Sequence, residues 1–79
     1  MQKHPQLVAV GKQIRKVRKA KGFTQEGFAA ESGIDRAYYG RIERGENNAA
    51  SLNLIKIAAT LKVEVGDLFP RMKTLKKAK

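Results

Sequence analysis

The apolar side chains of this 79-residue chain recur at helical spacing. Leu7, Val10, Ile14 and Val17 are three or four positions apart, so they share one face of a helix predicted over residues 7–21. The other faces of this helix carry lysines, and a glycine follows as a stop signal. The pattern therefore predicts a first amphipathic helix with a basic outer surface.

Two short helices are predicted next, over residues 25–32 and 36–44. Thr24 and Asp35 suit their first turns, because these side chains accept hydrogen bonds from backbone N–H groups. Gly33 lies between the two helices, and glycine takes the positive φ of a tight turn without steric cost. Apolar side chains are expected to hold the pair against the core: Phe28, Ala29, Ile34, Tyr39 and Ile42.

A fourth helix is predicted over residues 52–61, with Ser51 as its cap, and a short fifth helix over residues 65–69. No segment alternates with period two, so we expect no sheet. The predicted fold class is all-α, a compact domain of five helices. The fourth helix is expected to direct four side chains inward: Leu52, Ile55, Ala59 and Leu61.

The broken helical segment at residues 25–44 fits a helix-turn-helix, two short helices joined by a tight, glycine-containing turn. In such a unit the second helix protrudes and enters the major groove of DNA. Arg36, Ala37 and Arg41 lie on its predicted outer face, and arginine binding to guanine is the commonest specific base contact. The alternative is that the two arginines are ordinary solvated charges.

Other polar side chains border this predicted reading face. The start of the first helix of the pair is suited to a phosphate, because its backbone N–H groups point outward there. The loop after the second helix is rich in polar residues, although loop composition alone would also explain them. The candidate phosphate-binding residues are Thr24, Gln25, Tyr38, Arg44, Asn47, Asn48 and Ser51.

The charge of the chain indicates a polyanionic partner. The formal net charge is +10, with 17 basic and seven acidic residues. Residues 1–22 carry seven basic residues and residues 71–79 carry five, with no acid in either segment. Double-stranded DNA is the first candidate partner and anionic lipid the second. We expect a flexible leader at residues 1–6, the domain at 7–69 and a mobile basic tail at 70–79.

Several classes of chemistry lack the residues they need. The chain has no cysteine, and its one histidine, His4, lies in the leader, where we expect it to be solvated. We therefore predict no metal site, no cofactor and no catalytic role. No apolar run approaches the roughly 20 residues of a membrane span, and no signal peptide is present, so a cytoplasmic location is expected.

A homodimer is expected, because one recognition helix reads only a few base pairs. Apolar residues crowd the end of the domain, and the small core cannot absorb all of them. We expect the symmetric interface to use these residues with parts of the fourth helix; the alternative is that they close the core. They are Val63, Val65, Leu68 and Phe69.

The stretch "GFTQEGFAAESGIDRAYYGRIERGENN" resembles the repressor-like helix-turn-helix family, often called the XRE family, which includes phage repressors and Cro proteins. Within it the likeness is closest to controller proteins of restriction–modification systems, which typically show Gly-Leu-Asp-Arg-Xaa-Tyr and Glu-Arg-Gly stretches. The resemblance covers about residues 8–69. It implies a lambda-repressor-like fold of five helices that binds a pseudo-palindromic operator as a dimer.

Carried over to this chain, the resemblance implies phosphate binding by Gln25 and base reading by the three residues of the outer face. It also implies that Arg18 pairs with Glu43, which would join the first helix to the third. The chain departs from the family pattern at Gly27, where an acidic residue is usual, and at Tyr39, where an aliphatic one is usual. Its tail is also longer and more basic.

Two other functions remain open at this point. One is an antitoxin or phage-type repressor whose partner is a protein, which neighbouring genes would distinguish. The other is a membrane-surface binder that uses the basic first helix and tail, although this leaves the helix-turn-helix pattern unexplained. RNA polymerase is a further candidate partner of an activator, with Glu26 and Glu31 as guesses for its contact.

Overall fold

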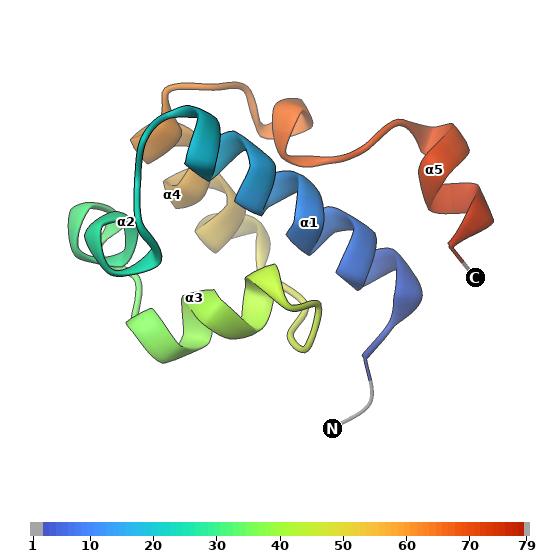
Figure 1. Cartoon of the computed structure of the whole chain (residues 1–79), viewed down its shortest axis with the longest axis horizontal. Helices are drawn as coiled ribbons and strands as arrows, with labels where there is room; N and C mark the ends of the chain where they lie inside the picture. The colour runs from blue at the N-terminus through green and yellow to red at the C-terminus, as the bar shows by residue number, and fades with distance from the viewer. Residues whose placement is uncertain (1–2, 79) are drawn as a thin grey trace.

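The computed structural model describes residues 3–78 of the chain. Within that range the chain is all helical, which confirms the predicted fold class. The α-helices are α1 (Pro5–Ala20), α2 (Gln25–Ser32), α3 (Arg36–Glu43), α4 (Ser51–Leu61) and α5 (Met72–Lys77), and one 3-10 turn, η1 (Val65–Leu68), precedes α5. Figure 1 shows α1 lying across α3 and α4, with α2 and α5 at opposite ends of the molecule.

The start of α1 differs from the prediction. The helix begins at Pro5, two residues early, because Nδ1 of His4 accepts a hydrogen bond from the backbone N–H of Gln6 at 3.1 Å. Proline suits the first helical position, where its missing N–H would have no partner. His4 therefore caps a helix, and the expectation of a flexible leader is wrong for residues 4–6. Residues 1–2 lie outside the described residues.

The helix-turn-helix is formed as predicted, with α2 at residues 25–32 and α3 starting at residue 36. Thr24 Oγ1 accepts from the N–H of Gly27 at 3.0 Å, and Asp35 Oδ2 accepts from the N–H of Tyr38 at 3.0 Å. Gly33 ends α2 in the left-handed conformation, with φ of 76°. A side chain at this φ would cost free energy, so the turn depends on glycine. Figure 1 shows α2 and α3 as separate helices at an angle.

The core lies between the helix-turn-helix and the helices on either side of it. The ring centroids of Phe28 and Tyr39 are 4.8 Å apart, and Phe23 meets Phe28 edge-on at 5.6 Å. Such aromatic pairs stabilise a small core beyond the area they bury. The buried cluster contains Ile14, Phe28, Ile34, Tyr39, Ile42, Ile57, Ala58, Leu61 and Leu68.

The orientation of α4 is the opposite of the predicted one. Leu52, Ile55 and Ala59 are exposed, whereas Ile57 and Ala58 are buried. Apolar residues occupy two faces of this helix, so periodicity alone supports either orientation. Of the four residues predicted to point inward, only Leu61 does so. The cap position is Ala50, and Ser51 is already the first helical residue.

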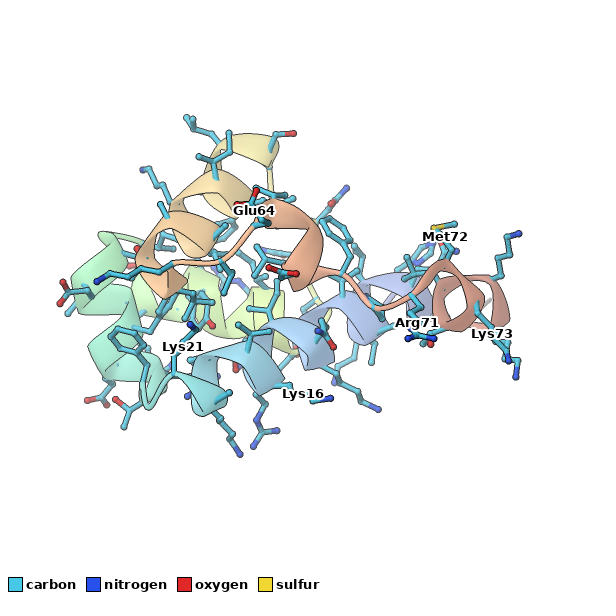
Figure 2. The ribbon with its side chains drawn as sticks, turned by 90° about the horizontal axis from the view of Figure 1, so that it is seen from above. Lys16, Lys21, Glu64, Arg71, Met72 and Lys73 are labelled. Carbon is cyan, nitrogen blue, oxygen red and sulfur yellow. The ribbon has the colours of Figure 1, made fainter. Side chains whose placement is uncertain are left out.

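The chain after η1 also differs from the prediction, because part of the expected mobile tail is helix α5. This helix lies against α1, where Gln6 Nε2 donates a hydrogen bond to the backbone oxygen of Leu75 at 3.0 Å. Figure 2 shows Arg71, Met72 and Lys73 at the end of the molecule that α5 forms. The predicted short fifth helix is only the 3-10 turn η1.

The crossing of α1 over α3 depends on Gly11. A Cβ at this position would lie 2.3 Å from the backbone oxygen of Glu43 and 2.6 Å from that of Ile42. Backbone atoms cannot move aside as the end of a side chain can, so α1 approaches α3 this closely only because residue 11 has no side chain.

We expect Gly11→Ala to destabilise the fold by about 1–3 kcal/mol, the usual cost of overpacking, despite the better helix propensity of alanine. The measurement is the free energy of unfolding from urea titrations. Gly66→Ala is the matched control, because a Cβ there meets no atom within 4 Å. Equal effects of the two substitutions would contradict the proposed close contact.

Candidate nucleic-acid interface

A buried ion pair connects α1 to α3 behind the recognition helix. Arg18 Nε lies 2.6 Å from Glu43 Oε2, and Arg18 Nη2 donates to Glu43 Oε1 at 3.2 Å. A third donor of the guanidinium, Nη1, reaches the backbone oxygen of Phe23 at 2.6 Å. The pair that the family resemblance implies is therefore present, and it fixes the end of α1 to the last turn of α3.

Two further side chains join this pair at Glu43. Tyr39 donates its hydroxyl hydrogen to Oε2, and Gln25 donates Nε2 to Oε1 at 3.0 Å. The buried hydroxyl of Tyr39 thus has a partner inside the core. The aliphatic residue that is usual at this position could not donate this hydrogen bond to Glu43. The four residues form a network, which we call the Glu43 network, that joins α1, α2 and α3. Among residues 3–78, no buried side-chain nitrogen or oxygen lacks a hydrogen-bond partner.

The pKa values in the Glu43 network reflect burial and hydrogen bonding together. Burial by itself would raise the pKa of Glu43, but the hydrogen bonds from Arg18, Tyr39 and Gln25 outweigh it, and the pKa lies below its ordinary value. The hydrogen bond to Glu43 raises the pKa of Arg18. Burial, and then the contact with Glu43, raise the pKa of Tyr39 far above its usual range. Glu43 is therefore ionised and Tyr39 neutral near pH 7.

The outer face of α3 carries the predicted base-reading residues. Arg36 and Ala37 are exposed in its first turn, and Arg41 is half-buried about one turn further on. Tyr38 is half-buried, and Asn53 of α4 donates to its hydroxyl oxygen at 3.3 Å. Asp35, Arg36 and Ala37 thus lie exposed together at the start of α3.

Apart from Tyr38, the predicted phosphate-binding residues fall into three places. Thr24 and Gln25 lie at the start of α2, although Gln25 has one amide N–H committed to Glu43. Asn47 is half-buried and Asn48 is exposed between α3 and α4, and Ser51, also exposed, begins α4. Arg44 is exposed at the end of α3, where its Nε donates to Glu46 Oε2 at 3.0 Å.

Two residues at this face were not expected from the sequence. Asn53 holds the hydroxyl of Tyr38, and Glu46 holds the guanidinium of Arg44. A signal for Asn53 existed, since it is a lone amide in an otherwise apolar turn of α4. The sequence contained no signal for Glu46, because it lies two residues from Arg44, whereas side chains on a helix usually pair at a spacing of three or four.

The four residues predicted at a dimer interface divide between the core and the surface. Leu68 is fully buried within the chain, so it has no surface to offer a partner. Val63 is half-buried against the core, whereas Val65 and Phe69 each expose more than a third of their surface. The most exposed large apolar residues of α4 are Leu52, 67% exposed, and Ile55, 54% exposed.

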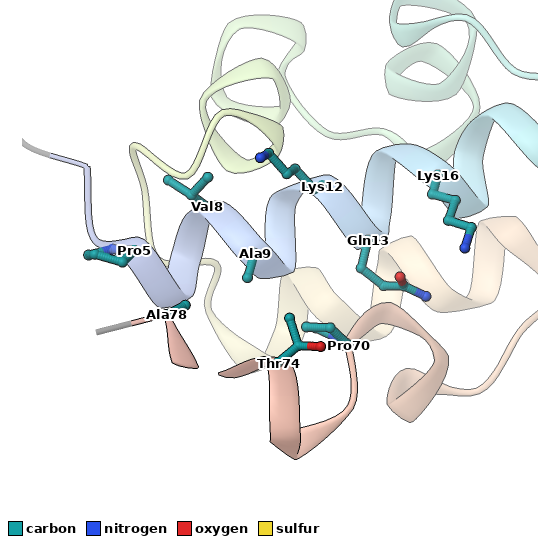
Figure 3. Close-up of a pocket in the computed structure, with 9 residues that line it drawn as sticks. All are labelled: Pro5, Val8, Ala9, Lys12, Gln13, Lys16, Pro70, Thr74 and Ala78. Carbon is teal, nitrogen blue, oxygen red and sulfur yellow. The ribbon is translucent and has the colours of Figure 1, made fainter. Parts of the chain in front are cut away.

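A groove of about 450 Å³ lies outside the helix-turn-helix, between α1 and the segment that contains α5. Figure 3 shows Ala9 and Gln13 of α1 opposite Pro70 and Thr74. Among residues 3–78, the charged residues that line it are Lys12 and Lys16, which offer no acid–base pair for catalysis. In the described range no group of three His, Cys, Asp or Glu is placed to hold a metal, and no helix there could cross a membrane.

Comparison with known proteins agrees with this geometry. Residues 14–68 match the helix-turn-helix family over more than half of the chain. The chain belongs to this family. The helix-turn-helix match contains α2, α3 and the Glu43 network, and it ends before α5.

The relatives of this helix-turn-helix chain include controller proteins. It is 41% identical over 63 residues to the control protein C.MunI of a Mycoplasma species, a match of 78% of this chain and 85% of that protein. The crystal structure of the restriction–modification controller protein C.AhdI from Aeromonas hydrophila superposes with a TM-score of 0.77 at 44% identity, covering 80% of this chain and 96% of that one. The controller protein C.Esp1396I, solved as a tetramer with its natural 35-base-pair operator, has a TM-score of 0.71 at 35% identity, covering 91% of each chain.

The Glu43 network predicts an acid-sensitive fold. Because the pKa of Glu43 is lowered on folding, its ionisation stabilises the protein above the ordinary glutamate pKa of about 4.3. This stabilisation is lost as the pH falls through the lower pKa of the folded state. Urea titrations between pH 7 and pH 3 should show the loss. Glu43→Gln should cost about 3–5 kcal/mol at pH 7, because Arg18 stays buried without its counter-charge.

Two variants complete the pH experiment. Glu43→Gln should also flatten the dependence of unfolding free energy on pH, while Glu31→Gln, a substitution at an exposed acid of α2, should retain most of it. Where Glu43→Gln is too unstable to titrate, Tyr39→Phe removes one hydrogen bond from the carboxylate and should move the acid loss to higher pH. Unchanged profiles in both variants would exclude Glu43 as the source.

Proposed function

We propose that this chain is a sequence-specific DNA-binding transcriptional regulator that acts as the controller protein of a restriction–modification system. The observation that carries the proposal is the exposed first turn of α3, set at an angle to α2 by the left-handed Gly33. A protruding helix of this kind fits the major groove, where its first residues meet base edges. The likeness to C.MunI and C.AhdI supports the controller function.

Each predicted contact has a physical basis. Arg36 would donate two hydrogen bonds to guanine O6 and N7, and Ala37 would lie against a thymine methyl group. Arg41 is expected to reach a base further along the groove. The start of α2, with Thr24 and the free N–H of Gln25, would hold a phosphate.

Further residues of α3, of the loop after it and of the start of α4 would hold other phosphates. This set consists of side chains that donate hydrogen bonds or carry a positive charge. Contacts to phosphates position the protein and carry no sequence information, so they complement the arginines of the reading face. The proposed residues are Tyr38, Arg44, Asn47, Asn48 and Ser51.

We also propose that the protein binds a pseudo-palindromic operator as a homodimer in the cytoplasm. Its symmetric surface would be the exposed apolar face of α4 together with the end of the domain, namely Leu52, Ile55, Val65 and Phe69. Exposed apolar surface marks interaction sites, and these four side chains are among the large apolar ones that the chain exposes. The operator complex of C.Esp1396I holds a tetramer, which supports assembly on DNA in proteins of this type. An activator would also contact RNA polymerase, for which Glu26 and Glu31 are exposed on α2.

Selection of bound sequences from random DNA, followed by footprinting, tests the proposed function. It returns the half-site, its spacing and its symmetry together. We expect two half-sites related by a two-fold axis, with centres one helical turn, about 34–36 Å, apart. Recovery of random sequences would contradict a specific regulator, and recovery of single half-sites would contradict a dimer.

We expect Arg36→Ala to weaken binding to the selected site by about 1–3 kcal/mol and to relax the preference at one base pair in each half-site. Binding isotherms on all four variants of that base pair measure both effects. The comparison protein is Lys76→Ala with Lys77→Ala, which removes charge from α5. It should weaken binding to all duplexes about equally and make the salt dependence shallower. The same behaviour for Arg36→Ala would contradict base reading.

We expect Ile55→Glu to prevent dimer formation while the monomer stays folded, because the side chain is exposed in the single chain. A buried unpaired charge at an interface costs several kcal/mol, so the dissociation constant should rise by at least 100-fold. Sedimentation equilibrium measures it, and circular dichroism checks the fold. Ala30→Glu adds the same charge at an exposed alanine of α2 and should leave the dimer intact. A strictly monomeric wild-type protein would contradict the dimer.

A further inference from the structure

Three side chains converge over Gly40 in the middle of α3. A Cβ built on Gly40 would lie 3.1 Å from Nη1 of Arg44, 3.3 Å from Nη1 of Arg36 and 3.7 Å from Oε1 of Gln25. The missing side chain thus leaves a gap, and two guanidinium groups from opposite ends of α3 lie in it. These side chains cover Gly40, which is buried.

Glu46 determines how Arg44 reaches this gap. Its carboxylate accepts from Arg44 Nε at 3.0 Å and from Nη2 at 3.3 Å, so both oxygens are engaged. This two-point contact fixes the plane of the guanidinium, as bidentate pairs do. The atom that remains, Nη1, is the one over Gly40. The backbone N–H of Glu46 in turn donates to the backbone oxygen of Arg41 at 2.9 Å, which anchors the acid to α3.

Like charges close together are unfavourable unless an anion lies between or beside them. Nη1 of Arg36 and Nη1 of Arg44 both lie within 3.3 Å of the position that a Cβ of Gly40 would take, whereas Glu46 contacts Arg44 through Nε and Nη2. The side that faces Arg36 is left for an incoming group. The Nη1 nitrogens of Arg36 and Arg44 are hydrogen-bond donors, and they suit the acceptor atoms of a guanine or a phosphate.

We propose that Glu46, together with the gap at Gly40, is a specificity determinant, because it holds the phosphate contact proposed for Arg44 in register with the base contact of Arg36 on the operator and neutralises Arg44 toward other DNA. This inference rests on the proposed function. Non-specific binding comes almost wholly from cations that neutralise phosphates, so an arginine that is already paired adds little to it. Binding to the operator instead gains from a guanidinium that is held in place before the DNA arrives.

The test compares two duplexes of equal length, the one recovered by selection and a scrambled one, over a range of salt concentrations. Glu46→Gln should free Arg44, steepen the salt dependence on scrambled DNA by up to about 0.9 in the log–log slope, and tighten that binding by roughly 5–10-fold near 0.1 M salt. Affinity for the selected duplex should stay level or fall, so the ratio of the two affinities drops.

Glu31→Gln is the matched control, because it removes the same charge from an exposed carboxylate at the far end of α2. It should change both affinities far less and in proportion. Gly40→Ala is the second variant. Only the flexible ends of side chains meet the new methyl group, so the protein should fold with an unchanged or higher Tm, yet lose affinity for the selected duplex.

The outcomes separate the two proposals. If the wild-type protein prefers no DNA sequence, the proposed function is wrong, and the role proposed for Glu46 is wrong as well. If the wild-type protein is selective but Glu46→Gln keeps the same affinity ratio and salt slope as Glu31→Gln, the function stands and the role of Glu46 is excluded. A selective Gly40→Ala protein with wild-type affinity would likewise exclude the role of the gap.

Discussion

The carboxylate of Glu43 is the interaction on which the rest of the structure depends. It accepts hydrogen bonds from Arg18 of α1, Gln25 of α2 and Tyr39 of α3, so three helices meet at two oxygen atoms. Apolar packing in a chain of this size leaves helices free to shift by small amounts at little cost. A charged group with several fixed partners does not, because each misplaced donor leaves a buried polar atom unsatisfied. The angle at which α3 projects is therefore tied to this network.

Such a network is a weak source of net stability, since taking Arg18 and Glu43 out of water costs nearly as much as their attraction returns. The Glu43 network instead fixes the positions of the helices relative to one another. Gln25 shows this directly: the residue that begins α2 is bound to the residue that ends α3, so the proposed phosphate-binding end of one helix and the proposed reading face of the other are positioned together. The close contact at Gly11 acts in the same direction, because it brings the backbone of α1 against Glu43 itself.

The parts of this fold that the sequence predicted are those fixed by local chemistry. Thr24, Gly33 and Asp35 set the limits of α2 and α3, because a cap or a positive φ acts within a few residues. The orientation of α4 was predicted wrongly, since Ile55 and Ile57 offer equally apolar faces and only the tertiary core selects between them. Helix α5 was missed for the same reason, because its contact partner, Gln6, is distant in the sequence. At the site, the exposure of Arg36 was predictable, whereas the hold of Glu46 on Arg44 needed coordinates.

The excess positive charge of the chain lies outside the helix-turn-helix. Residues 23–70, which contain the whole helix-turn-helix, carry five basic and seven acidic residues, so the +10 of the chain comes from α1 and the residues that include α5. Electrostatic attraction reaches about 8–10 Å at physiological salt, while the molecule measures 32 × 27 × 21 Å. The positive surface therefore attracts DNA to the protein broadly and without regard to sequence. The segment 23–70, whose charges nearly cancel, adds little to that general attraction, so the arginines of the proposed reading face can discriminate between sequences while most of the affinity does not depend on them.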